Sequence, residues 1–288
     1  MKMTRRRFLS VSAATLVASA AHASTARWQG RAMGAEVSLV LHGGTQQDLD
    51  AAVTEIRRVE RLFSIYDPTS ELSHLNKNSG GRLSPDTQDL LALCDSVHRT
   101  TDGLFDPTVQ PVFRAALHGR ALPWHLVGWD RVRIEQGHLT MAKGQQLTLN
   151  GIAQGYATDQ VRDLLTARGF AKALVSVGEH SAIGGPFRLQ LEDPIHGPLG
   201  LRTLEDSAIA TSSPNAMQLG VGAHIFDPTG RAVPLWSTVS VEAKSAALAD
   251  GLSTALCMAP RDQIAQIAGA TGTRITLIDR SGDLTRLG

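Results

Sequence analysis

Hydrophobic side chains recur along the chain with two spacings. Some segments alternate as strands do, and others have an apolar residue every three or four positions, as helices do. Residues 36–41 alternate and then become continuously apolar before Gly43-Gly44, which predicts a strand that ends at a turn. Residues 48–65 place apolar side chains every three or four positions, with charged residues opposite, which predicts an amphipathic helix. By the same patterns, further helices are expected over 87–99, 154–168 and 245–258, and further strands over 132–134, 147–149, 174–177 and 274–278.

The order of these elements predicts a mixed α+β fold. Helices and strands interleave without the regular alternation of a parallel α/β protein. The chain has 288 residues, enough for a large hydrophobic core, and neither an internal repeat nor a Pro-, Gly- or Ser-rich linker divides it. We therefore expect one compact unit over residues 24–288, in which Gly169 provides a left-handed cap after the helix over 154–168.

The first 23 residues have the composition of an export signal. Arg5-Arg6-Arg7-Phe8-Leu9 precedes an apolar run rich in Ala, Ser and Val, and Ala21-His22-Ala23 supplies the small residues that a signal peptidase reads. The segment resembles a twin-arginine signal, and we therefore expect a periplasmic protein. A surface helix with an arginine-rich start is the alternative. Neither this apolar run nor a later one reaches the ~20 residues of a membrane span.

Composition and charge narrow the class of protein further. With 42% hydrophobic and 19% charged residues, the chain differs from disordered, collagen-like and coiled-coil sequences. Residues 1–23 hold four of the 28 basic residues and none of the 27 acidic ones, so residues 24–288 carry a formal charge of −3. This balance argues against a nucleic-acid partner. Cys94 and Cys257 lie among apolar neighbours, which favours buried free thiols, with a disulfide as the alternative.

One short segment with a carboxylate and two hydroxyls is the first candidate for chemistry. The chain lacks the P-loop, G-x-G-x-x-G, G-x-S-x-G, H-E-x-x-H and C-x-x-C motifs, so a nucleotide site must be built in another way. In the helix expected over 245–258, Asp250, Ser253 and Thr254 share one face among small and apolar residues. A bound Mg²⁺ would offset the cost of burying Asp250. The alternatives are an Asp exposed on one side or one that caps a neighbouring loop.

Two further segments place polar groups beside tight turns. Asn150-Gly151 leads into the helix over 154–168 through small residues, so that its backbone N–H groups could meet a phosphate and a carbonyl could meet a metal. His224 precedes Asp227-Pro228 at a rigid corner, and its imidazole suits proton transfer near neutral pH. A purely structural role is the alternative in both cases.

Seven blocks of the sequence form an ordered set over roughly residues 33–256. They are Met33-Gly34, Ser64-Ile65-Tyr66 with Ser70 to Asn76, Thr101 to Pro107, Asn150 to Asp159, Ala208 to Ser212, His224 to Gly230, and Ala249 to Ala255. In this order the blocks resemble those of the ApbE family, the FAD:protein FMN transferases. Each block alone is a weak signal, whereas the ordered set covers most of the chain.

The resemblance implies an α+β catalytic domain and a reaction. In that reaction FMN passes from FAD to a Thr or Ser hydroxyl of an acceptor flavoprotein, and AMP leaves. The resemblance implies that Mg²⁺ is held by Asp250, by Ser253 or Thr254, and by the carbonyl of Gly151. It makes His224 the catalytic base and Asp250 the second catalytic residue. The residues that it implies for the FAD site are Met33, Tyr66, Leu104, Phe105, Asp106, Gln154 and Ile225.

The chain also departs from the family pattern. Many relatives carry Lys or Glu at the position of Gln154, and a glycine usually follows Gly178, where this chain has Glu179-His180. With the export signal, these departures look closest to the NosX-like branch, which serves nitrous-oxide respiration by flavinylating a membrane partner. The alternatives are an exported FAD carrier or assembly factor without transferase activity, and an FAD pyrophosphatase that releases free FMN.

Overall fold

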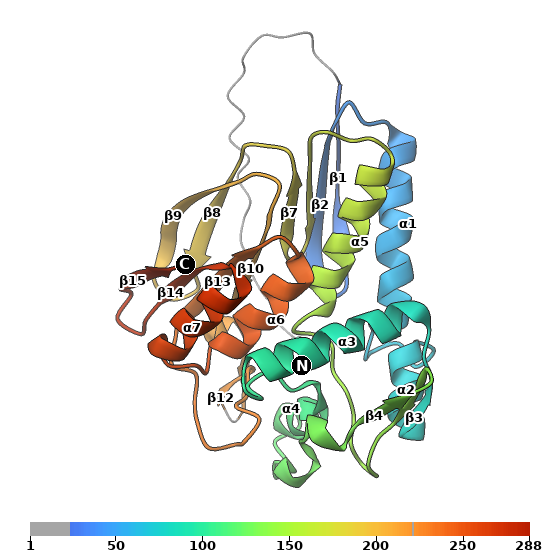
Figure 1. Cartoon of the computed structure of the whole chain (residues 1–288), viewed down its shortest axis with the longest axis vertical. Coiled ribbons are helices and arrows are strands. Elements are labelled where there is room, and N and C mark those ends of the chain that lie inside the picture. The colour runs from blue at the N-terminus through green and yellow to red at the C-terminus, as the bar shows by residue number, and fades with distance from the viewer. Residues whose placement is uncertain (1–23, 221) are drawn as a thin grey trace.

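An eight-stranded antiparallel sheet forms the centre of the molecule (Figure 1). The computed structural model describes residues 24–220 and 222–288, so the export signal expected over residues 1–23 lies outside the described residues. The strands of the sheet, in spatial order, are β1 (Thr25–Ala32), β2 (Ala35–His42), β6 (Ala173–Val177), β7 (His180–Ile183), β10 (Ala208–Ser212), β13 (Thr238–Ala243), β14 (Arg274–Ile278) and β15 (Leu284–Leu287).

Seven α-helices and three small sheets surround this centre in the described part of the chain. The helices are α1 (Gln46–Phe63), α2 (Glu71–Asn78), α3 (Pro85–Thr100), α4 (Gln110–Leu117), α5 (Ala153–Ala167), α6 (Ala246–Leu256) and α7 (Arg261–Thr271). The small sheets are built from β3 (Gly80–Arg82), β5 (His138–Thr140) and β4 (Arg133–Glu135), from β8 (Phe187–Asp193) and β9 (Gly197–Leu204), and from β11 (Gln218–Leu219) and β12 (Gly222–Ala223). Helices and antiparallel sheets thus confirm the expected α+β class.

The two faces of the main sheet are covered differently. Helices α1, α5 and α6 pack on one face, where alternate residues of the strands, such as Leu39 and Val175, join the main hydrophobic core. On the other face, Leu174 and Ile209 pack with Leu191 of the β8–β9 hairpin in a second, smaller cluster. Because successive strand residues point to opposite faces, both clusters draw on the same strands. This arrangement fixes α5 and α6 side by side, with α5 against β6 and β7 and α6 against β10 and β13 (Figure 1).

Most of the elements that the sequence pattern predicts lie near their expected positions. The strand expected over 274–278 is β14 without change, and Gly169 follows α5 in the left-handed region with φ +83°. Helix α1 begins at Gln46, two residues before the expected start. The reason is that Thr45 caps the helix and forms a reciprocal capping box with Asp48.

The strand expected over 147–149 is a wrong prediction. Leu147 and Leu149 are buried, as their spacing suggests, but the segment pairs with no strand in the described chain. Instead, Leu147 N–H donates to Oδ1 of Asn76 at 2.6 Å, and its carbonyl accepts from Nδ2 at 2.8 Å. A side-chain amide therefore replaces the partner strand. The neighbouring strand β4 begins one residue later than expected and pairs with β5.

Within residues 24–220 and 222–288, none of the helices combines the length and the apolar character needed to cross a membrane. Cys94 and Cys257 are both buried and free, as their apolar neighbours indicate. Burial raises the pKa of both thiols, which disfavours the reactive thiolate.

His180 in β7 makes the stability of the fold depend on pH. Its side chain is buried, and desolvation lowers its pKa from 6.5 to about 4. The folded state therefore favours the neutral ring. The stabilisation is complete above pH 6.5 and is lost as the pH falls through the range between 6.5 and about 4. The full loss is about 3 kcal/mol by linkage.

We expect His180→Leu to remove most of this acid sensitivity. Urea unfolding of wild type and variant between pH 7.5 and pH 4.5 measures the difference. The free energy of unfolding of the variant should fall less on acidification. The exposed strand residue His138 provides a matched control, because His138→Gln should follow the wild-type curve. Parallel curves for wild type and His180→Leu would contradict the prediction.

Candidate active site

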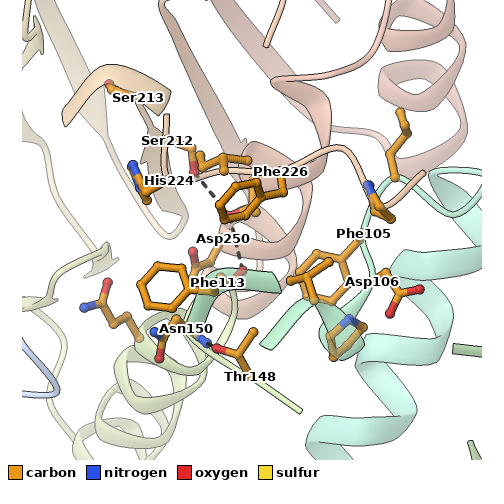
Figure 2. Close-up of a pocket in the computed structure, with 18 of the residues that line it drawn as sticks. Phe105, Asp106, Phe113, Thr148, Asn150, Ser212, Ser213, His224, Phe226 and Asp250 are labelled. Atoms are coloured by element: carbon orange, nitrogen blue, oxygen red, sulfur yellow. Dashed lines mark hydrogen bonds between the residues drawn. The ribbon is translucent and has the colours of Figure 1, made fainter. Parts of the chain in front are cut away.

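A cavity of about 970 Å³, counted with its solvent-filled mouth, opens beside the start of α5 and the face of α6 (Figure 2). It is lined by residues of the segments 104–113, 148–154, 211–216 and 224–228, together with Glu179, Asp250 and Thr254. The aromatic rings of Phe105, Phe113 and Phe226 border the same space as the polar groups of Asp250 and His224. The site thus combines apolar surface for a ring system with convergent polar groups.

Two Asp-Pro-Thr turns build the walls of this cavity. Asp106 accepts hydrogen bonds at Oδ1 from the N–H and hydroxyl of Thr108, at 2.7 and 2.6 Å, and at Oδ2 from Trp129 N–H at 3.0 Å. Asp227 accepts from the N–H of Thr229 at Oδ1, at 3.1 Å, and from its hydroxyl at Oδ2, at 2.5 Å. Burial raises the pKa of Asp106 despite these bonds. Asp106, implied as a FAD contact, therefore lines the cavity while its carboxylate holds the loop in shape.

Asp250 lies at the centre of the site and caps a neighbouring helix. Its side chain is 3% exposed, and Oδ2 accepts from Gly155 N–H at 3.1 Å. Gly155 is the third residue of α5, whose N-cap residue Ile152 offers no side-chain acceptor. Asp250 thus supplies the acceptor that α5 lacks, so it caps the start of a helix and not a neighbouring loop. The same carboxylate lines the cavity, so capping and ligand binding are compatible.

Two of the other implied metal donors line the same cavity as Asp250, and one does not. Thr254 Oγ1 lies 3.5 Å from the carbonyl oxygen of Gly151, and both residues line the cavity. A Cβ on Gly151 would lie 2.9 Å from Thr254 Oγ1, so glycine permits this approach. Ser253 is fully buried away from the cavity, where its hydroxyl donates to Asp250 O and contacts Ser212 Oγ at 2.8 Å. The packing therefore favours Thr254 over Ser253 as the hydroxyl donor.

The donors at this point suit a hard divalent cation. A carboxylate, a hydroxyl and a backbone carbonyl are all oxygen ligands of the kind that Mg²⁺ takes, and Mg²⁺ usually completes its shell with water and substrate phosphates. In residues 24–220 and 222–288, no group of three or more His, Cys, Asp or Glu side chains could hold a metal ion. A cation here would depend on the mixed oxygen donors of Asp250, Thr254 and Gly151.

His224 is held in one orientation by backbone carbonyls. Its Nδ1 lies 3.0 Å from Pro214 O and 3.2 Å from Met217 O. Carbonyl oxygens only accept, so Nδ1 carries a proton and donates to them. His224 also lines the cavity, so the ring borders the space that a ligand would occupy.

Gln154 connects the cavity to the turn between β1 and β2. Its Nε2 donates to Met33 O at 3.0 Å, while Met33 N–H donates to Glu60 Oε1 at 2.6 Å. Met33 has φ +51°, a conformation that costs a non-glycine residue of the order of 1 kcal/mol. Two hydrogen bonds thus hold a strained turn at the edge of the site. Met33 itself does not line the cavity in the described chain, whereas Gln154 does.

The other residues implied for the FAD site divide into two groups. Leu104, Phe105 and Ile225 line the cavity. Tyr66 does not, and its side chain is 71% exposed on the loop before α2. Its role as a FAD contact stays a prediction.

Glu179 and Ser212 are cavity residues to which the sequence analysis gave no role. Glu179 is 4% exposed, and its Oε2 accepts from Thr211 N–H at 3.0 Å. Ser212 Oγ lies 3.3 Å from Thr254 Oγ1. An acidic residue between two buried strands was the available signal for Glu179, since a buried carboxylate needs partners or a ligand.

The close contact of α5 and α6 at Gly155 gives a testable prediction about stability. A Cβ at Gly155 would lie 2.3 Å from Ala246 O, a backbone atom that cannot move alone. We expect Gly155→Ala to lower the free energy of unfolding by about 1–3 kcal/mol because the helices must separate. Gly269 in α7 is a matched helical control, with nothing within 4 Å of its Cβ position. Gly269→Ala should raise stability by about 0.5–1 kcal/mol. Equal changes for both variants in urea unfolding would contradict the prediction.

Comparisons with known proteins agree on one family. The sequence model of the ApbE family matches residues 33–278. A relative from Vibrio cholerae named FAD:protein FMN transferase is 28% identical over 271 residues, which cover 83% of this chain and 80% of the relative. One of the same name from Chlamydia pneumoniae is 25% identical over 78% of this chain and 79% of its own length. The apo structure of the Pseudomonas stutzeri flavinyl transferase ApbE superimposes with a TM-score of 0.80 at 24% identity, covering 92% of this chain and 95% of that one.

Proposed function

Because the chain belongs to the ApbE family, we propose that it transfers FMN from FAD to a Thr or Ser hydroxyl of an acceptor protein, with Mg²⁺ bound, and releases AMP. The observation that carries this proposal is the convergence of Asp250, Thr254 and the Gly151 carbonyl in the same cavity as His224. The names of the relatives support FAD as the donor and a protein as the acceptor.

The groups that would hold Mg²⁺ are the carboxylate of Asp250, the hydroxyl of Thr254 and the carbonyl of Gly151. Mg²⁺ bound there would neutralise charge on the pyrophosphate as the bond to the leaving group breaks. Two contacts keep these donors in place. Gly155 N–H donates a hydrogen bond to Asp250, and Thr254 packs against Gly151. The cavity rings of Phe105 and Phe226 would cover the apolar part of the flavin.

In the proposed step, the acceptor hydroxyl oxygen bonds to the phosphorus of the FMN half of FAD. The bond from that phosphorus to the bridging oxygen breaks, and AMP leaves with the bridging oxygen. The hydroxyl proton goes to Nε2 of His224, because Nδ1 already donates to the carbonyls of Pro214 and Met217. Phosphoryl transfer depends mainly on alignment and charge neutralisation, which these groups would supply.

The proposed setting is the periplasm. The arginine-rich start and the Ala21-His22-Ala23 sequence support export by the twin-arginine route, with residues 24–288 as the mature domain. The departures from the family pattern support a NosX-like protein whose acceptor is a membrane flavoprotein of nitrous-oxide respiration.

The test combines the protein of residues 24–288, FAD, Mg²⁺ and a periplasmic flavin-acceptor domain. We expect a fluorescent acceptor band on a denaturing gel and one AMP released for each flavin attached. Both should disappear with EDTA. The matched control is an acceptor domain whose attachment residue is replaced by Ala. It should show no fluorescent band.

Other outcomes separate the alternatives. Steady release of AMP with free FMN and no labelled acceptor would favour an FAD pyrophosphatase. Stoichiometric binding of FAD without AMP would favour a carrier, for which the uncharged Gln154 in the cavity is the supporting observation.

A further inference from the structure

Helix α6 contacts α5 and the turn before it at three successive points, which we call the helix-pair ladder. Thr254 meets Gly151 at the first rung, Asp250 meets Gly155 at the second, and Asp159 meets Ala246 at the third. From each rung to the next, the position moves four residues forward from Gly151 into α5 and four residues back along α6. The two segments therefore run antiparallel in one fixed register.

The third rung is the most extensive of the three. Asp159 Oδ1 accepts from Ala246 N–H at 2.9 Å, and Oδ2 accepts from Ala247 N–H at 3.0 Å and from Ser245 Oγ at 2.7 Å. Ser245 is also the N-cap of α6 and accepts from Leu248 N–H. One carboxylate thus binds the first turn of α6 from outside the helix. Each helix supplies an Asp to the start of the other, because Asp250 accepts from the first turn of α5.

The helix-pair ladder leaves α5 and α6 little room to move relative to one another. A Cβ at Gly155 would lie 2.3 Å from Ala246 O, so the two backbones are already in contact between the second and third rungs. Asp159 itself is not among the residues that line the cavity. It stands four residues after Gly155 along α5, which corresponds to about 6 Å beyond the second rung. It can therefore influence the first two rungs only by fixing how α6 sits against α5.

We propose that Asp159 is a positioning residue for the divalent cation site formed by the first two rungs. The inference rests on the proposed function, since it takes Asp250, Thr254 and the Gly151 carbonyl as the cation donors. By clamping the start of α6, Asp159 sets the axial position and rotation that bring Asp250 and Thr254 toward Gly151. Mg²⁺ requires near-octahedral geometry at short distances, so its binding responds to small shifts of its donors.

The test is direct cation binding, with Mn²⁺ as the probe. Electron paramagnetic resonance of free Mn²⁺ gives the dissociation constant for the protein of residues 24–288, first with Mn²⁺ alone and then with FAD added. We expect Asp159→Asn, which keeps the volume but places an amide N–H₂ against backbone donors, to weaken Mn²⁺ binding about tenfold. Ser245→Ala keeps the two backbone bonds to Asp159, and its effect should be smaller.

A variant that loses a helix cap far from the cavity distinguishes an effect on cation binding from a general loss of stability. Thr45→Ala removes the cap of α1, which lies outside the cavity, and it should lower the thermal midpoint without changing Mn²⁺ affinity. In transfer assays, excess Mg²⁺ should restore most of the rate of Asp159→Asn, whereas a general folding defect would not respond to the cation.

The outcomes distinguish this inference from the proposed function. Wild-type affinity in Asp159→Asn, with Mn²⁺ binding intact in wild type, would overturn the inference and leave the cation site in place. No Mn²⁺ binding by wild type, with or without FAD, would overturn the cation site and the role of Asp159 together.

Discussion

Replacing Asp250 with Asn is expected to lower the rate of flavin transfer about 10³-fold, because a cation held by this carboxylate would supply several kcal/mol of transition-state stabilisation. Asn keeps the volume and one acceptor oxygen, so the hydrogen bond from Gly155 N–H can persist. The variant should therefore fold while the negative charge at the centre of the cavity is lost. The measurement is the initial rate of acceptor labelling at saturating FAD.

The charge-matched control is Asp262→Asn. Asp262 is exposed in the first turn of α7 and lies outside the cavity, so its replacement should leave the rate within about twofold of wild type. Asp250→Ala would confuse two effects, since it also removes the acceptor for the start of α5. Transfer by Asp250→Asn at the wild-type rate would exclude the carboxylate from the mechanism.

The sequence predicts an element well where the burial of one of its faces is enough to produce a regular spacing of apolar residues. The spacing of apolar residues locates α1, α3, α5 and α6 because each helix buries one face on the main core. It fails at residues 147–149, where the partner is Asn76, a side chain that lies 71 residues earlier in the chain. Periodicity reports that Leu147 and Leu149 are buried, but it carries no information about what satisfies their backbone.

In the candidate site, too, local spacing predicts some features, whereas others depend on contacts with distant parts of the chain. Helical spacing places Ser253 and Thr254 beside Asp250, but it cannot decide between them because both lie on the same side of α6. The decision comes from the packing of the folded chain, because the Ser253 side chain is fully buried outside the cavity lining, whereas Thr254 lines the cavity. Likewise, Asp250 serves as a cap for α5 only because two helices far apart in sequence run antiparallel, which no local pattern encodes.

Replacing His224 is the second change with a large expected effect. The structure allows its two ring nitrogens to be tested separately. Asn at this position places an N–H₂ near the site of Nδ1, so it can still donate to Pro214 O or Met217 O, but it has no group at Nε2. We expect His224→Asn to lower the transfer rate about 10²–10⁴-fold, the usual contribution of a general base. FAD affinity, measured by flavin fluorescence, should stay within about threefold of wild type if the ring mainly accepts the proton.

The matched control is His118→Gln, because the Nδ1 of His118 also lies 2.8 Å from a backbone carbonyl, but the residue is exposed and outside the cavity. Its transfer rate should not change.

The products that His224→Asn forms show which step depends on the imidazole. If AMP and free FMN accumulate while acceptor labelling is lost, the pyrophosphate is still cleaved, and His224 selects the acceptor hydroxyl over water. If neither product forms, His224 takes the proton in the step that breaks the bond. If labelling continues at the wild-type rate, another group accepts the proton, and the ring of His224 only holds Pro214 and Met217 in place through Nδ1.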